Sequence, residues 1–172
     1  RMGEYNIALI EADKMLREAE ISQKKESMAN CYYSLANIYT AKGLPGKSQE
    51  FMLKEIDLYE KYNLKRPHIS FQYSDAAKIY LDKGEIKPAL PLLKKAMETA
   101  ESAYHLVTAK LAYVSYYMAI NDMDSARKEL QSCREMYRKE PVILRHINYF
   151  YDVEANYYRK IGNLDAALNS VE

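Results

Sequence analysis

The chain has few cysteines and no excess of either charge. Only two cysteines, Cys31 and Cys133, occur in 172 residues, too few for a disulfide framework. Both lie in amphipathic segments, so we expect buried free thiols, although the pattern leaves a disulfide open. Lys and Arg total 25 against 24 Asp and Glu, a formal net charge of +1. A near-neutral chain has no overall field that would attract nucleic acid or an anionic membrane, and we expect neither partner within these residues.

Long apolar runs are also missing from the sequence. The most apolar stretch, residues 106–120, is interrupted by Lys110, whereas a membrane-spanning helix needs about 20 apolar residues. The start has no secretory signal. Because the chain begins with Arg1 and Gly3 is expected in a turn, we expect a fragment of a longer protein. The cytoplasm is the favoured compartment, and the periplasm is the alternative if the parent protein is a membrane-anchored sensor.

What the chain does contain is a regular recurrence of tyrosine. A tyrosine stands four residues before a short turn marker, and a small residue stands five residues after it. The markers, each with its tyrosine and small residue, are Gly43 (Tyr39, Ser48), Gly84 (Tyr80, Ala89), Asn121 (Tyr117, Ala126) and Gly162 (Tyr158, Ala167). A partial copy, Gly3 with Ala8, opens the chain, and the five markers are spaced by 40, 41, 37 and 41 residues. Self-similarity at such a period predicts a repeat array that presents an extended surface.

Each segment between two markers has the pattern of two helices. Residues 47–62 carry one apolar helical stripe, residues 63–67 interrupt it, and a second stripe follows from Tyr73 to Tyr80. The alternation typical of β-strands is not evident. The small residues around each marker would let the two helices of a pair approach closely. The sequence therefore predicts an all-α solenoid of antiparallel helix pairs.

The repeated residues resemble tetratricopeptide repeats. Gly162–Leu168, Lys83–Leu90 and Gly3–Leu9 are similar to the family's turn and second helix, and Ala36 with Tyr39 matches its pattern before the turn. The period of about 40 residues is closest to the repeats of bacterial regulatory and sensor proteins. The resemblance implies a single right-handed α–α superhelix over residues 1–172. Its expected units are a partial repeat at 1–20, repeats at 21–64, 65–102 and 103–140, and a truncated last repeat at 141–172.

Signals of catalytic or metal chemistry are weaker than the repeat pattern. Ala41–Ser48 fits a relaxed phosphate-loop pattern, but it follows a predicted helix rather than a strand, so a repeat turn is the better interpretation. His68, His105 and His146 each stand sixteen residues before a marker. Equivalent positions in neighbouring repeats should lie about 8–10 Å apart, too far to share a zinc ion. We therefore expect no catalytic residue, no metal site, no cofactor and no enzymatic activity.

The resemblance implies that the first helix of each pair lines a concave groove that binds a peptide. By position, the residues ten, six and three before each marker should face this groove. They are Tyr33, Asn37 and Thr40; Ser74, Lys78 and Leu81; Leu111, Ser115 and Met118; and Asp152, Asn156 and Arg159. Asn37, Lys78 and Asn156 resemble residues that clamp a peptide's C-terminal carboxylate in such arrays. Tyr33, Leu81 and Met118 would supply apolar contact.

The leading functional hypothesis is thus a non-enzymatic scaffold module that binds a protein or peptide segment in its concave face. One alternative is a ligand- or partner-sensing domain of a bacterial signalling protein or transcription regulator, with its output domain outside this chain. Another is self-association, because incomplete terminal repeats would expose apolar helix faces. A concave face that only meets solvent is a further alternative.

Overall fold

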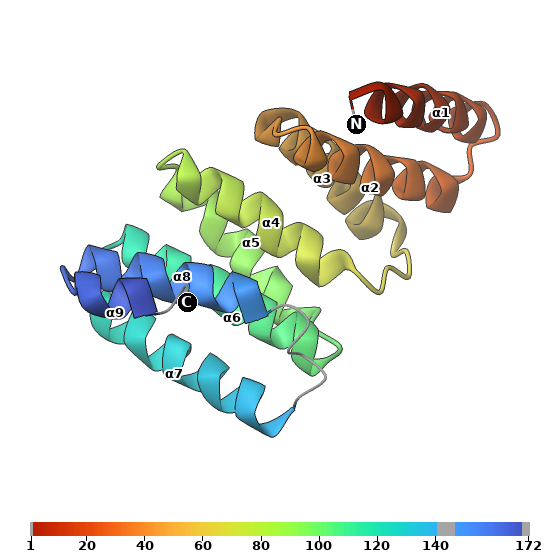
Figure 1. The fold of residues 1–172 in the computed structure, drawn as a ribbon. Helices are drawn as coiled ribbons and strands as arrows, with labels where there is room; N and C mark the ends of the chain where they lie inside the picture. The colour runs from red at the N-terminus through yellow and green to blue at the C-terminus, as the bar shows by residue number, and fades with distance from the viewer. Residues whose placement is uncertain (1, 141–146, 170–172) are drawn as a thin grey trace.

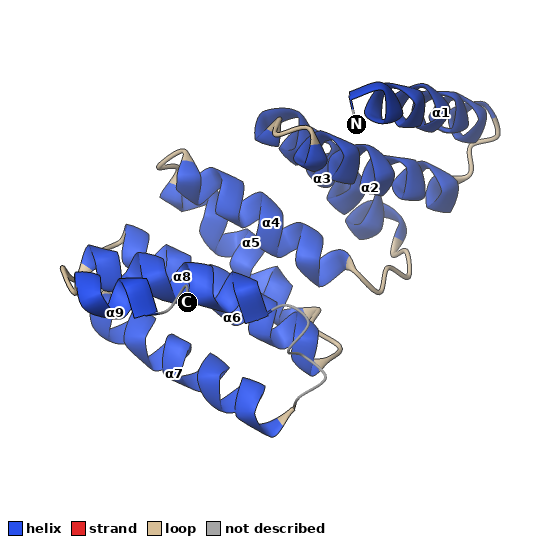
Figure 2. Ribbon diagram, in the orientation of Figure 1, coloured by secondary structure: helices blue, strands red, loops and turns tan. Residues whose placement is uncertain are grey.

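The computed structural model describes residues 2–140 and 147–169, which are helical apart from short connections (Figure 1, Figure 2). In chain order the helices are α1 (Met2–Ile21), α2 (Lys25–Ala41), α3 (Pro45–Tyr62), α4 (Ile69–Asp82), α5 (Ile86–Glu98), α6 (Ala103–Ala119), α7 (Met123–Lys139), α8 (Ile147–Lys160) and α9 (Leu164–Asn169). No strand occurs in these two ranges. The all-α prediction is therefore confirmed.

Neighbouring helices pack in pairs along the chain. Helix α2 packs on α3, α4 on α5, α6 on α7 and α8 on α9, and successive pairs meet through contacts such as α3 with α4 and α4 with α6. Figure 1 shows the pairs following one another from the red end of the chain to the blue end. The buried apolar residues form three clusters along this row rather than one central core. This arrangement is an all-α helical repeat solenoid.

The repeat turns all close with the same backbone hydrogen bonds. At Gly43, where φ is +69°, the N–H donates to the Thr40 carbonyl at 2.9 Å, and the Leu44 N–H donates to the Tyr39 carbonyl at 2.9 Å. Equivalent bonds close the turns at Gly84, Asn121 and Gly162, each also in the left-handed region. This is the Schellman motif, which ends a helix at a left-handed residue. The spacing from tyrosine to marker is therefore the spacing from the third-last helical residue to its cap.

The small residues lie where the two helices of a pair cross. Ser48, Ala89 and Ala126 are fully buried, and so are Ala36 and Ala77 on the facing helices. The Ser48 hydroxyl donates to the Ala36 carbonyl at 2.9 Å, a bond that joins α3 directly to the backbone of α2. A larger side chain would have no room at this contact. The expected role of the small residues in close helix packing is thus confirmed.

The expectation that Gly3 lies in a turn is wrong. Helix α1 begins at Met2 and includes Gly3. Within the described residues no helix precedes Gly3, so there is no helix end for it to cap. The α1–α2 turn instead lies at Gln23, where φ is +53° and the Lys24 N–H donates to the Ala19 carbonyl at 3.1 Å. This turn leads into the first helix of the next pair, so it is not a copy of the marker turns, and its left-handed residue is glutamine rather than glycine or asparagine.

The cysteines are buried free thiols, as expected. Burial is the main reason that the pKa of Cys133 rises to about 12, so this side chain acts as a small apolar group in the core. None of the described helices is both long and apolar enough to cross a membrane.

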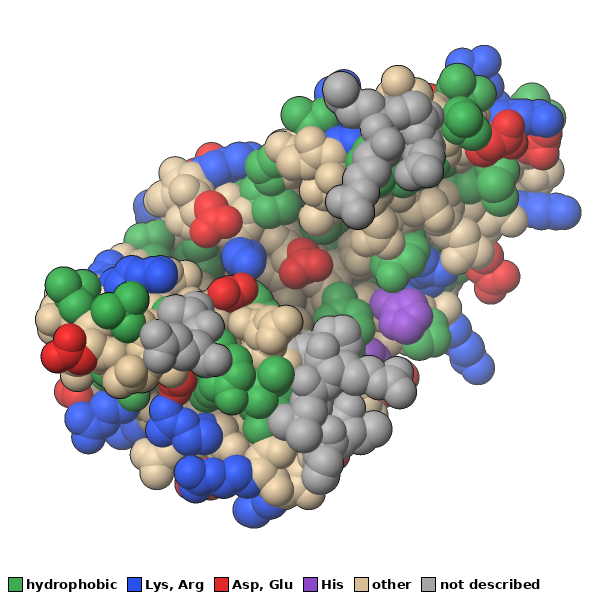
Figure 3. Space-filling model, in the orientation of Figure 1, with side chains coloured by type: hydrophobic (Ala, Val, Ile, Leu, Met, Phe, Trp, Pro, Cys, Tyr) green, Lys and Arg blue, Asp and Glu red, His purple; other side chains and the backbone are tan. Residues whose placement is uncertain are grey.

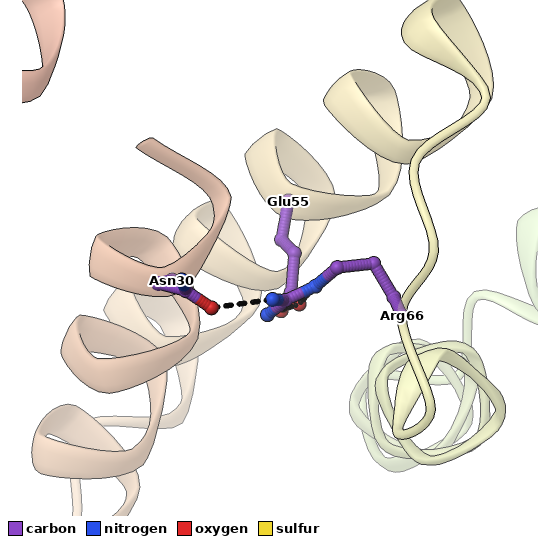
Figure 4. A network of polar contacts seen from close by, with 3 residues as sticks. All are labelled: Asn30, Glu55 and Arg66. Carbon is purple, nitrogen blue, oxygen red and sulfur yellow. Dashed lines mark hydrogen bonds and ion pairs between the residues drawn. The ribbon is translucent and has the colours of Figure 1, made fainter. Parts of the chain in front are cut away.

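An arginine anchors the connection between α3 and α4. Arg66 donates from Nε and Nη2 to Oε1 of Glu55 at 3.0 and 2.6 Å, and from Nη1 to Oδ1 of Asn30 at 2.5 Å (Figure 4). The Glu55 side chain is only 1 % exposed. Burial raises its pKa, and the hydrogen bond and charge of Arg66 oppose that rise. The network holds the loop against both α2 and α3, and so fixes how the next pair begins.

Candidate functional site

Two adjoining cavities lie along the first helices of the repeats. The Asp75 cavity, about 280 Å³, is lined by Thr40, Gly43, Pro45, Met52, Asp75, Lys78, Ile79 and Asp82. The Tyr149 cavity, about 250 Å³, is lined by Lys78, Leu81, Asp82, Ser115, Met118, Ala119, Tyr149, Asp152, Val153, Asn156 and Lys160. Lys78 and Asp82 line both cavities, so we describe the two together as the inner groove. It runs from the end of α2 across α4 and α6 to α8.

The inner groove carries charges of both signs. Figure 3 shows this face hollowed between the α2–α4 side and α8, with acidic and basic side chains gathered at the hollow. The Lys78 ammonium lies over the Tyr149 ring, 4.7 Å from its centroid, within the range of a cation–π interaction. Desolvation, opposed by Lys78, raises the pKa of Asp75 to about 6. The Asp75 side chain is exposed to solvent within the groove, and the helices around it desolvate its carboxylate only in part.

Half of the residues expected to face the groove line the Tyr149 cavity. These are Lys78, Leu81, Ser115, Met118, Asp152 and Asn156. Thr40 lines the Asp75 cavity, where its hydroxyl lies 2.7 Å from the Ser48 hydroxyl. Asn37 and Arg159 are exposed but line neither cavity. Lys78 and Asn156 therefore share a cavity, and Asn37 is not part of it.

Ser74 and Leu111 do not face the groove, contrary to the expectation from position. Ser74 is 2 % exposed and donates to the Ser70 carbonyl at 2.9 Å. Leu111 is fully buried in the core formed with α7 and α8. Both stand ten residues before a marker, where the contact of α4 with α6, and of α6 with α8, covers the side chain. Leu81 is also largely buried, at 9 % exposure, and forms the floor of the Tyr149 cavity rather than an open contact.

Tyr33, the one aromatic residue among the twelve expected in the groove, belongs to a separate aromatic cluster. Its ring stacks on His68 with centroids 6.0 Å apart, and Phe71 and Tyr104 continue the cluster. The rings of His68 and His105 meet at 6.4 Å, closer than the repeat spacing predicted, because both side chains turn toward Phe71. Burial, and secondly the charge of His68, lowers the pKa of His105.

Asp75, Asp82 and Tyr149 are among the groove residues that the sequence expectation did not include. Asp75 and Asp82 lie three residues before and four residues after Lys78, so helical spacing places all three on one face of α4. That spacing could have identified them. Tyr149 comes from a different repeat, and no local pattern pairs it with Lys78.

The weaker chemical signals do not form sites in the described part of the chain. No group of three or more His, Cys, Asp or Glu there could hold a metal ion. Ala41–Ser48 spans the end of α2, the turn at Gly43 and the start of α3, so it is a repeat turn and follows a helix. His146 lies outside the described residues. The larger cavity, about 640 Å³, lies between the α3–α4 and α5–α6 connections, away from the inner groove.

The fold and the groove together define the class of protein: a helical repeat protein whose inner groove is lined by charged, polar and apolar side chains. Comparison with models of known protein families and with curated proteins finds no match to the chain.

Proposed function

We propose that the chain is a non-enzymatic module of tetratricopeptide type that binds a protein or peptide segment in the inner groove. The observation that carries the proposal is the junction of the two cavities at Lys78 and Asp82. Each cavity has room for one or two side chains, and their junction gives a path across several repeats. An extended segment fits such a path better than a compact small molecule does.

The groove lining suits a peptide in its chemistry as well as its shape. Ser115, Asn156 and Thr40 offer groups that can bond to peptide N–H and C=O groups. Met52 and Met118 offer flexible apolar contact, one in each cavity. The helices that hold these side chains pack against one another in the free protein, so binding costs little conformational entropy.

A display selection with a random 12-residue peptide library tests the proposal. Selected peptides are compared on the unaltered chain and on Ala119→Trp, which places an indole in the Tyr149 cavity from an exposed position. The matched control is Lys94→Trp, on an exposed site of α5 outside both cavities. We expect binding to fall at least tenfold for Ala119→Trp and to be unchanged for Lys94→Trp. Peptides that bind all three proteins equally would contradict the groove assignment.

We also propose self-association as a second candidate, because α1 and α9 expose apolar side chains. Ile7 and Ile10 are 64 % and 65 % exposed one turn apart on α1, and Leu164 and Leu168 are 64 % and 63 % exposed on α9. Light scattering coupled to size exclusion measures the mass of the unaltered chain and of Ile7→Lys, Ile10→Lys. A dimer that the double substitution converts to a monomer supports the candidate, and a monomer at every concentration removes it.

A further inference from the structure

The inner groove contains carboxylates that form no ion pair with any other described side chain. Asp75, Asp82 and Asp152 take part in none of the hydrogen bonds or ion pairs formed among the described residues. This differs from the buried Glu55, whose charge Arg66 meets directly. The three carboxylates lie in the same groove as two ammonium groups, those of Lys78 and Lys160, so the described lining has a net charge of −1.

One cation of the chain itself, the Lys78 ammonium, already lies against an aromatic ring of the groove. The Lys78 ammonium already rests on the face of the Tyr149 ring, 4.7 Å from the centroid. An aromatic face and nearby carboxylates are the groups that bind lysine and arginine side chains in proteins. Because Lys78 is held at Tyr149, it does not close an ion pair with any of the three carboxylates.

We propose that the segment bound in the inner groove is basic, and that a lysine or arginine side chain of this segment lies among Asp75, Asp82 and Asp152. The proposal rests on the proposed peptide-binding function and names the ligand's chemistry. It replaces the carboxylate clamp expected from Asn37, Lys78 and Asn156. A bound C-terminal carboxylate would be repelled by Asp75 and Asp82, which flank Lys78 on α4.

The environment of Asp75 supports this assignment. Its side chain is exposed within the groove, and the charged or titratable groups around it among the described residues are Lys78 and Asp82 on α4, Tyr104 on α6 and Tyr149 on α8. From α2 and α3 the cavity receives the uncharged Thr40 and Met52. Among the described residues around Asp75, only Lys78 brings a positive charge, so a ligand cation would offset the free-energy cost of desolvating the Asp75 carboxylate. Since the pKa of Asp75 is about 6, the ionised form that attracts a cation dominates only above that pH.

Fluorescence anisotropy with three labelled eight-residue peptides tests the proposal. The peptides alternate serine with arginine, with glutamine or with glutamate, so they differ in charge at equal length. We expect the arginine peptide to bind at least tenfold more tightly than the glutamine peptide, and the glutamate peptide not to bind. Affinity for the arginine peptide should fall severalfold between pH 7.5 and pH 5, as Asp75 becomes protonated.

Two variants of equal net charge distinguish binding by the groove carboxylates from attraction by the net charge of the protein. The groove variant is Asp75→Asn, Asp82→Asn, Asp152→Asn, and its control is Asp13→Asn, Asp57→Asn, Asp124→Asn, at exposed sites outside the groove. We expect the groove variant to lose at least tenfold in affinity for the arginine peptide and the control to lose less than twofold. Circular dichroism confirms that both remain helical.

The possible failures of this test are distinguishable. An equal loss in both variants would show that net charge alone attracts the peptide, and would overturn the proposal. Tight binding of the glutamine or glutamate peptide that Ala119→Trp abolishes would also overturn it, while leaving the groove as a peptide-binding surface. If the arginine peptide fails to bind although the display selection yields groove-dependent peptides, the basic ligand is wrong and the proposed function stands.

Discussion

At the scale of single residues, Asp75 shows a conflict between stability and binding. Desolvation raises its pKa from 3.8 to about 6 in the folded chain. For an acid whose pKa is raised on folding, the folded state binds more protons over this interval, so stability is lost as pH rises from about 4 to about 6. A residue that lowers stability at neutral pH suits a binding role better than a structural one.

Asp75→Asn should therefore stabilise the chain at pH 7 and do little at pH 4. We expect a gain of about 0.5–1 kcal/mol, kept small because the Asp75 side chain is exposed and solvent screens its charge. Urea unfolding followed by circular dichroism at both pH values measures it. The control is Asp57→Asn, at an exposed site on α3. A loss of stability at pH 7 would show that the Asp75 charge is structurally useful and that the argument is wrong.

At the scale of elements, the left-handed caps fix where each first helix ends. Gly84 has φ of +77°, and no atom lies within 4 Å of the Cβ that an alanine would add, so its only penalty is backbone strain. Gly84→Ala should cost about 1 kcal/mol. Gly46→Ala is the matched control, because Gly46 lies inside α3 with open space around it and should gain about 0.5 kcal/mol. Chemical denaturation that gave both variants the same sign would contradict this account of the turns.

The Arg66 network is the second device at this scale. Arg66→Ala leaves the buried Glu55 carboxylate without its cation, which should cost about 3 kcal/mol at pH 7. The loss should shrink as the pH falls, because burial raises the pKa of Glu55 and protonation then removes the buried charge. Lys54→Ala, which breaks the exposed pair with Glu50, should cost less than about 0.5 kcal/mol. Equal losses in the two variants would mean that the network does not anchor the loop.

The elements also show which features the sequence could predict. Turns at Gly43, Gly84 and Gly162 were predictable because a left-handed cap restricts the residue type, whereas Gln23 occupies such a cap without the usual residue. The burial of Leu111 was not predictable in the same way. It depends on how closely α6 approaches α8, which is a property of the packed repeats rather than of any local pattern.

At the scale of the whole molecule, the groove arises because the repeats place their first helices side by side. Asp75 and Lys78 come from α4, and Tyr149 from α8, more than sixty residues later in the chain. No single repeat contains the site. Truncation between α7 and α8 should therefore remove peptide binding even where the remaining helices fold, because a repeat array can lose an end unit and keep its neighbours.

The groove assignment is tested most directly by NMR of the chain labelled at its methionine methyl groups. Met52 lies in the Asp75 cavity and Met118 in the Tyr149 cavity, while Met15 on α1 and Met136 on α7 line neither. On titration with the most enriched selected peptide, we predict that the Met52 and Met118 signals shift together and saturate at one ratio, with Met15 and Met136 unchanged. Saturable shifts at Met15 or Met136, with Met52 and Met118 unmoved, would place the binding surface elsewhere and contradict the account.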